Sequence, residues 1–200
     1  LWVGGRTYEV TGRGYEPEGD IRSTDGDGEL PDDVRTLLTV GAFTSDASVL
    51  QDSDGQWQAE GPPTEAAIHV AARKAGLDGT KLQDELPRQD ELPFSSDTQY
   101  SAALHPLEDG GRRLYVAGAP LRVAEFCGEI TAEGQPQPMS DDWRQRLAEA
   151  NEAFAKDGLR VVAGAYRDWP DDAGEIPRDQ AERDLVFAGL WAMADAPRQE

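Results

Sequence analysis

The chain is poor in the residues on which self-contained catalytic sites and secreted folds often rely. Its 200 residues include one cysteine and two histidines. Cys127 alone excludes an internal disulfide and a cysteine-based metal site. His69 and His105 lie far apart in the sequence, which favours structural or surface roles over catalysis. No run of about 18 apolar residues predicts a transmembrane helix, and no basic-then-apolar start predicts a signal peptide. Because the chain begins at Leu1, we expect a piece excised from a longer protein.

Basic residues are also scarce. The chain has 19 lysines and arginines against 39 acidic residues, a formal net charge of −20. Such a charge disfavours binding to nucleic acid and to anionic membrane surfaces. The same acidic excess is typical of proteins from a salty cytoplasm, so the charge alone does not point to one function. An apolar fraction of 38% is enough for a core, in one sizeable domain or two small ones.

Motifs for self-contained catalysis are absent from the sequence. It contains no Gly-x-Ser-x-Gly, Walker or His-Glu-x-x-His motif, so an independent soluble enzyme has no supporting signal. Two acidic turns also fail as calcium loops. With Asp25 in first position, Leu30 falls where the loop needs glycine, and Asp52–Gly55 lacks a terminal glutamate in register. Both stretches are therefore predicted to be solvated turns.

Hydrophobic periodicity predicts an α+β domain in which helices lie between mostly antiparallel strands. Strands are expected at residues 1–11, 56–59, 112–117, 160–166 and 185–191, with a strand–turn–strand unit over 91–105. Helices are expected at residues 32–43, 64–75, 80–86, 118–127 and 140–158. Val34, Leu37, Leu38 and Val40 are expected to face inward in the first of these helices, and Ser140 is expected to cap the last. Turn or loop structure is expected at residues 12–33, 52–55, 107–111 and 135–138, and a polar loop with a short helix over 169–184.

The stretch Trp57–Leu77 combines an extended segment, a Gly-Pro-Pro turn and a strongly predicted helix. Thr64 is a natural N-cap, and Glu60 and Glu65 place negative charge near the positive end of the helix dipole. Gly76 is expected to end the helix. A turn of this kind presents backbone N–H groups and a carboxylate. It is suited to docking a small polar ligand, or it is simply a well-capped helix.

Six stretches carry recognisable motifs in a fixed order. They are Tyr8–Ile21 with Gly-Tyr-x-Pro-x-Gly, Trp57–Leu77 with Gly-x-Pro-Thr-Glu-Ala-Ala, Leu92–Ser96 with Pro-Phe-x-Ser, Arg113–Arg122 with Gly-Ala-Pro, Gly158–Val161 with Gly-Leu-Arg, and Leu185–Arg198 with Asp-x-Pro-Arg. Together they resemble the nucleotide-binding domain of P-type cation-pump ATPases, and they cover nearly the whole chain. The wording of the second stretch is most similar to that of calcium and related cation pumps.

The resemblance implies one nucleotide-binding domain over residues 1–200, with residues 1–6 and 192–200 near a hinge. It implies a twisted antiparallel sheet of six or seven strands flanked by helices. It also implies that the domain binds ATP, as Mg-ATP, and presents it to an aspartate of a neighbouring phosphorylation domain. The Asp-Lys-Thr-Gly-Thr loop that carries this aspartate is absent here. The chain alone is therefore expected neither to hydrolyse ATP nor to move an ion.

The expected partners follow from the same resemblance. They are ATP and the phosphorylation and actuator domains of the same membrane-embedded parent protein. The domain is expected to lie in the cytoplasm as a monomer, with no nucleic acid partner, no membrane insertion of this segment and no metal held by its own residues.

The resemblance assigns roles to four side chains. Phe94 falls on the aromatic that stacks on adenine, and Glu65 on the acid near the adenine amino group. Arg160 falls on the arginine that contacts phosphate, and Arg198 on a hinge position that meets ribose or phosphate when the domains close. Each also has a structural interpretation: a core phenylalanine, a helix-start charge or a surface cation.

Departures from the family pattern fall on the same site. The two expected lysines are replaced by Gln99 and by Ala117, which precedes Gly118, and an arginine position by Ser96. An Asp is replaced by Pro62 and a hinge proline by Ala196. Each lost charged hydrogen bond is worth about 1.5–3 kcal/mol. Two hypotheses follow: a weakened domain that still binds ATP, or a fold that no longer binds it and serves as a structural or regulatory interaction module.

Overall fold

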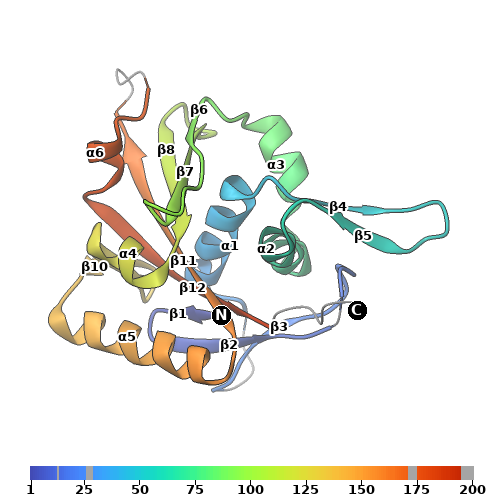
Figure 1. Cartoon of the computed structure of the whole chain (residues 1–200), viewed down its shortest axis with the longest axis horizontal. Coiled ribbons are helices and arrows are strands. Elements are labelled where there is room, and N and C mark those ends of the chain that lie inside the picture. Colours follow the sequence, from blue (N-terminus) through green and yellow to red (C-terminus); the bar gives the residue numbers. More distant parts are fainter. Residues whose placement is uncertain (13, 26–28, 171–174, 195–200) are drawn as a thin grey trace.

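A large, mostly antiparallel sheet forms the centre of the molecule (Figure 1). The computed structural model describes residues 1–12, 14–25, 29–170 and 175–194. Within these residues the sheet has ten strands in the order β3-β2-β1-β12-β11-β8-β7-β6, and β9 joins β10 to β12. The pairing of β9 with β12 is parallel. The strands are β1 (Trp2–Val3), β2 (Arg6–Val10), β3 (Ile21–Ser23), β6 (Asp90–Leu92), β7 (Tyr100–Pro106), β8 (Arg112–Gly118), β9 (Cys127–Ala132), β10 (Gln135–Pro138), β11 (Arg160–Trp169) and β12 (Leu185–Met193). A separate hairpin, β4 (Ser48–Gln51) and β5 (Trp57–Glu60), projects from the body.

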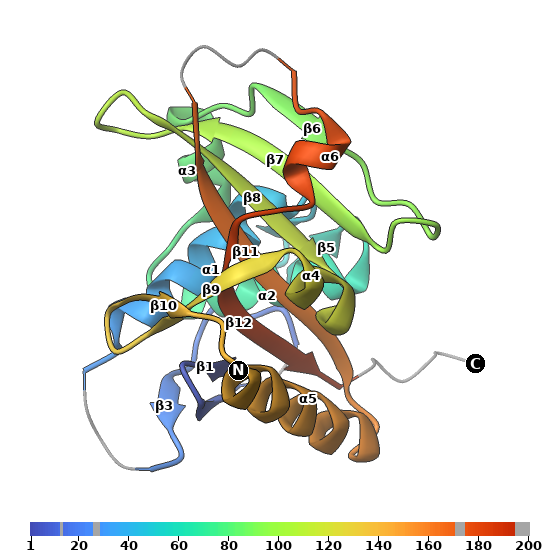
Figure 2. The ribbon, with the colours of Figure 1, turned by 90° about the vertical axis from the view of Figure 1, so that its left-hand side faces the viewer.

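Helices cover both faces of the sheet, as Figure 2 shows with one group in front of it and the other behind. One face carries α1 (Asp32–Thr44), α2 (Pro63–Lys74) and α3 (Gly79–Glu85). The other carries α4 (Pro120–Glu125), α5 (Asp141–Lys156) and α6 (Arg178–Ala181). Each face has its own hydrophobic cluster, because successive side chains of a strand point to opposite faces. The fold therefore has three layers.

Helix α1 packs against the sheet through Leu37. Leu37 on α1 is fully buried. A methyl group built on Gly164 of β11 or on Gly189 of β12 would lie 3.0 Å from a methyl carbon of Leu37. Because these two positions have no side chain, the Leu37 side chain packs against the strand backbone. This contact sets the position of α1 over the middle of the sheet.

Most of the expected elements are confirmed. The α+β class and the antiparallel sheet flanked by helices are as predicted, and the helix expected at residues 32–43 is α1, with its predicted inward side chains buried. Ser140 caps α5, since its hydroxyl accepts a hydrogen bond of 3.3 Å from the backbone N–H of Trp143. The turn at Asp52–Gly55 joins β4 and β5 as expected.

The expected strand number, six or seven, was too low. The single strand predicted over residues 1–11 is the hairpin of β1 and β2, because Gly4 and Gly5 adopt φ values of 54° and 80°. Residues with positive φ at both turn positions are typical of two-residue hairpins. Strand β3 lies inside the stretch predicted to be turns, where it pairs with β2.

Two further boundaries were wrong around β9. The loop expected at Gln135–Pro138 is strand β10, which pairs only with β9. An edge strand tolerates its two prolines because one side of its backbone needs no partner. The helix expected to run to Cys127 ends at Glu125, since Cys127 begins β9 and pairs with Leu185 of β12.

Replacing the central leucine of α1 tests the importance of its contact with the sheet. We expect Leu37→Ala to lower the free energy of unfolding by about 2–5 kcal/mol, because a buried leucine is lost and the glycine backbone cannot fill the cavity. Urea denaturation measures this change. Leu50→Ala in β4 is the control, because Leu50 is 50% exposed. A similar loss of unfolding free energy in both variants would contradict the prediction.

Two buried tyrosines make stability depend on alkaline pH. Burial raises the pKa of Tyr115 to about 12, and burial with a hydrogen bond to Glu182 raises that of Tyr100 to about 12. In the unfolded chain both ionise near 10. The unfolded state therefore loses protons first, and stability falls between pH 10 and 12 by up to about 1.4 kcal/mol per pH unit for each tyrosine. Urea unfolding at pH 9, 10 and 11 should show a shallower decline in Tyr115→Phe than in the parent chain; equal declines would refute this origin.

Candidate functional site

The start of α2 ties together three segments of the chain. Thr64 is not the N-cap, as had been expected: the helix begins at Pro63, and Pro62 occupies the cap position without a side-chain hydrogen bond. A proline in the first turn needs no N–H partner, so the helix can start there without a cap. Glu65 lies in the first turn as predicted, and its carboxylate accepts a hydrogen bond of 2.8 Å from the backbone N–H of Asp46. The Glu65 side chain is thereby fixed against the segment after α1.

Glu65 and Phe94 line the same small cavity, although they are far apart in sequence. The cavity has a volume of about 100 Å³. Its walls are the end of α1, the start of α2, the segment around β6, and β7, with lining residues Thr44, Asp46, Glu65, Arg88, Glu91, Leu92, Pro93, Phe94, Ser101, Ala102 and Ala103. Phe94 is 65% exposed, so it is not the core phenylalanine of the structural interpretation. Its ring is free to stack on a planar ligand.

Arg160 lies next to this cavity. It is the first residue of β11, and its Nη1 donates a hydrogen bond of 3.2 Å to the hydroxyl of Thr64, the neighbour of Glu65. Its guanidinium is exposed and can also contact an anion. The structure thus brings Glu65, Phe94 and Arg160 to one region of the surface, at the edge of the α1–α3 layer.

The positions that lack the family's lysines lie on the adjoining strand ends. Ala117 of β8 pairs with Ser101 of β7, which lines the cavity. Gln99, with φ of 62°, precedes β7, and its carbonyl accepts a hydrogen bond of 2.9 Å from the N–H of Ala119. A methyl group on Gly118 would lie 2.4 Å from that carbonyl oxygen, so this crossing requires glycine. Glycine at position 118 is therefore explained by this close backbone contact.

Three other predicted positions are Ser96, Ala196 and Arg198. Ser96 is exposed in the loop between β6 and β7. Arg198 and Ala196 lie outside the described residues.

Arg88 is a cavity residue that the sequence did not reveal. Its guanidinium forms ion pairs with Asp46 at 2.7 Å and with Glu91, and its side chain is 21% exposed. Burial lowers the pKa of Arg88, but its hydrogen bonds to Asp46 and Glu91 outweigh burial and raise the pKa above its usual value. Asp46 is 42 positions away in the sequence, so no local pattern could have indicated this pair. Arg88 joins the wall near Phe94 to the wall near Glu65.

The histidines have structural surroundings. His105 is fully buried, with Nδ1 2.8 Å from the Leu86 carbonyl and Nε2 3.2 Å from the Phe43 carbonyl. His69 is buried within α2, and burial lowers the pKa of both rings. In the part of the chain that the structure describes, no group of three or more His, Cys, Asp or Glu side chains could hold a metal ion. No described helix is long and apolar enough to cross a membrane.

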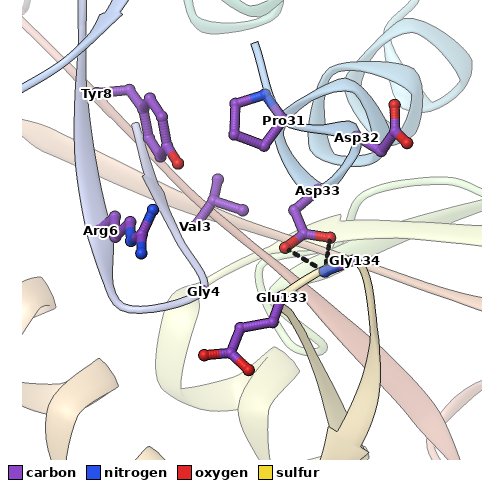
Figure 3. Close-up of a pocket in the computed structure, with 9 residues that line it drawn as sticks. All are labelled: Val3, Gly4, Arg6, Tyr8, Pro31, Asp32, Asp33, Glu133 and Gly134. Atoms are coloured by element: carbon purple, nitrogen blue, oxygen red, sulfur yellow. Dashed lines mark hydrogen bonds between the residues drawn. The ribbon is translucent and has the colours of Figure 1, made fainter. Parts of the chain in front are cut away.

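A larger cavity, of about 330 Å³, lies elsewhere (Figure 3). It is bounded by the β1–β2 turn, the start of α1 and the β9–β10 turn, with lining residues Val3, Gly4, Arg6, Tyr8, Pro31, Asp32, Asp33, Glu133 and Gly134. Both carboxylate oxygens of Asp33 accept hydrogen bonds of 3.1 Å from the N–H of Gly134. One arginine and three carboxylates line this larger cavity, which is the same charge balance as in the lining of the cavity around Phe94.

Breaking the Arg88 link should loosen the cavity walls. We expect Arg88→Gln to lower the free energy of unfolding by about 1 kcal/mol and to speed hydrogen exchange of the Asp46 amide. Lys156→Gln is the control, because it removes a fully surface ion pair with Glu152 and should cost less than about 0.5 kcal/mol. Unchanged exchange at Asp46 would show that Arg88 does not hold this wall.

Known proteins with similar sequences cover the whole chain. Residues 33–200 match the family model described as P-type ATPase, cytoplasmic domain N. The chain is 35% identical over its whole length to the cation-transporting ATPase pma1 of Synechocystis, and 37% identical over 99% of its length to the probable cation-transporting ATPase F of Mycobacterium tuberculosis. It is 30% identical over its whole length to the calcium-transporting ATPase of Bacillus subtilis.

The matches also define how much of these proteins the chain represents. It spans 22% of the length of each of the three relatives, so it corresponds to one domain of a larger protein. The family match covers α1 from its second residue and every element after it, including the whole cavity region around Glu65 and Phe94. The chain belongs to the family of P-type ATPase cytoplasmic N domains.

Proposed function

We propose that this domain binds ATP, as Mg-ATP, at the surface formed by Glu65, Phe94 and Arg160, and presents it to the phosphorylation domain of a cation pump. The observation that carries the proposal is the convergence of these residues from α2, the β6–β7 loop and β11. Glu65 and Phe94 line one cavity, and Arg160 hydrogen-bonds to Thr64 beside it. Three distant segments of the chain thus supply one site.

The chemistry of these side chains suits the two ends of a nucleotide. The exposed ring of Phe94 offers a face for adenine, and base–aromatic stacking is worth about 1–3 kcal/mol. The Glu65 carboxylate can accept a hydrogen bond from the adenine amino group. Arg160 can bind phosphate oxygens with its planar guanidinium. In the parent pump, ATP would supply the phosphoryl group for the aspartate of the neighbouring domain.

The same geometry favours weak binding. A cavity of about 100 Å³ is well below the roughly 300 Å³ or more typical of small-molecule sites, so a nucleotide would lie on an open surface. Gln99 and Ala117 add no positive charge where the family pattern has lysines. Arg88 is already paired with Asp46 and Glu91 and does not replace them. We therefore infer an affinity for Mg-ATP in the millimolar range.

Titration with Mg-ATP tests the site directly. Amide chemical shifts of Glu65, Phe94 and Arg160 should change over several millimolar Mg-ATP, and Phe94→Ala should remove most of this response because the stacking face is lost. Phe94 is exposed, so this variant keeps the fold. If the parent chain shows no response at these residues, ATP binding fails and the structural or regulatory module becomes the better hypothesis.

Restoring the missing cations provides a second arm of this titration. Gln99→Lys with Ala117→Lys should tighten binding at least about tenfold, since each new charged hydrogen bond contributes about 1.5–3 kcal/mol. Gln145→Lys with Ala148→Lys is the matched control. It makes the same two replacements at exposed positions of α5, on the other face of the sheet, and so changes the net charge equally. Equal tightening in both would assign the effect to net charge alone.

A further inference from the structure

A third cavity, next to α1 and apart from the nucleotide surface, combines features of a binding site. It has a volume of about 220 Å³ and lies between the first half of α1 and the strand pair β8–β11. Its lining residues are Asp32, Arg35, Thr36, Thr39, Arg113, Tyr115 and Tyr166. None of these residues lines the cavity around Phe94. We call this space the α1 cavity.

The strand register explains why these side chains meet. Tyr115 of β8 is opposite Tyr166 of β11, and Arg113 is opposite Asp168. Residues two apart on a strand share a face, so all four point toward the α1 layer. The guanidinium of Arg113 lies 4.8 Å from the ring centre of Tyr166, and its Nε donates a hydrogen bond of 2.6 Å to Asp168. Arg113 is thereby held in place with its two terminal nitrogens unused by any described residue.

Tyr115 is the most informative residue of the α1 cavity. It is only 3% exposed, and its ring stacks on Phe43 with 4.8 Å between ring centres. Yet its hydroxyl has no hydrogen-bond partner among the described residues. Because Tyr115 lines the α1 cavity, this hydroxyl can donate a hydrogen bond to a molecule that enters the cavity.

The remaining polar groups decide the chemistry of that partner. Arg35 is exposed at the rim and forms no ion pair within the described residues. The hydroxyls of Thr36 and Thr39 already donate to backbone carbonyls one turn earlier, at 3.0 and 2.9 Å, so they are not free donors. The free donors are then the guanidinium of Arg35, the terminal nitrogens of Arg113 and the hydroxyl of Tyr115. Such a set matches the oxygens of a carboxylate or phosphate.

Two aspartates, Asp32 and Asp168, lie near the arginines of the α1 cavity. The Asp168 carboxylate is engaged by Arg113. Asp32 lies at the rim, and Figure 3 shows its carboxylate turned away from Arg6 and Glu133 of the larger cavity. Two arginines therefore face two aspartates, one of them neutralised. In a chain of net charge −20, this is a locally balanced site that can accept a small anion.

We propose that the α1 cavity is a binding site for a small oxyanion, held by Arg35, Arg113 and Tyr115. The site is built from α1, β8 and β11, whereas the nucleotide surface lies beyond the other end of α1. Its ligand is thus independent of the adenine site. Carboxylates and phosphates share the chemistry that these donors recognise.

Titration with inorganic phosphate tests this proposal, with acetate as the carboxylate arm. Chloride keeps the ionic strength constant, because general screening affects so acidic a chain. We expect saturable chemical-shift changes at Arg35, Arg113 and Tyr115, with phosphate, acetate or both, and none at Phe94. Tyr115→Phe should weaken binding about three- to tenfold, and Arg35→Gln at least tenfold. Asp32→Asn should tighten it, since a repelling carboxylate is removed.

The controls separate a site from a general charge effect. Arg146→Gln removes an exposed guanidinium from α5 on the opposite face and should leave the affinity unchanged. Thermal melting verifies that each variant is folded. No saturable response to either anion, or a response equal in the parent, Tyr115→Phe and Arg35→Gln, would overturn the proposal. Shifts confined to Glu65, Phe94 and Arg160 would do the same, and would instead support the nucleotide surface.

Discussion

The contact of Leu37 with two glycines on the sheet is the constraint on which the rest of the structure depends. It places the Leu37 side chain of α1 directly against the backbone of β11 and β12. A helix of 13 residues is about 20 Å long, so its two ends reach different regions of the molecule. The last turn contributes Thr44 to the cavity around Phe94, and the first half contributes Arg35 to the α1 cavity. One packing contact thereby positions both sites.

Local signals were sufficient for the elements that carry their own pattern. The apolar periodicity of α1 and the serine before α5 are visible in the sequence because a helix meets its core with every third or fourth residue. Strands β3 and β10 have no such pattern. They are short, polar and stabilised by a single neighbour, so their existence depends on the hairpins that present β2 and β9 to them. The prediction that Thr64 caps α2 was also wrong, because Pro62 and Pro63 begin the helix without a side-chain cap.

In the candidate site, too, local motifs were visible in the sequence and contacts between distant residues were not. Glu65, Phe94 and Arg160 could be named because each stands in a short motif whose order resembles that of a known family. Their contacts could not be named. Arg160 and Thr64 are 96 positions apart, and Arg88 and Asp46 are 42 apart. Tyr115 looked like an ordinary strand residue, and only the fold shows that its hydroxyl lacks a partner. Sequence motifs identify chemistry, whereas tertiary structure decides which groups are already engaged.

Whether a charged group is already paired also determines how the net charge acts on the sites. A charge of −20 suggests a surface that repels every anion, but screening limits its reach to about 8 Å at physiological salt. Within that distance the pairing of each group matters. Arg88 neutralises part of the charge of Asp46 and Glu91, and Arg113 does the same for Asp168. The local field at each site is therefore closer to neutral than the total implies. For the nucleotide site that we propose, the absence of lysine at Gln99 and Ala117 therefore matters more than the acidity of the whole chain.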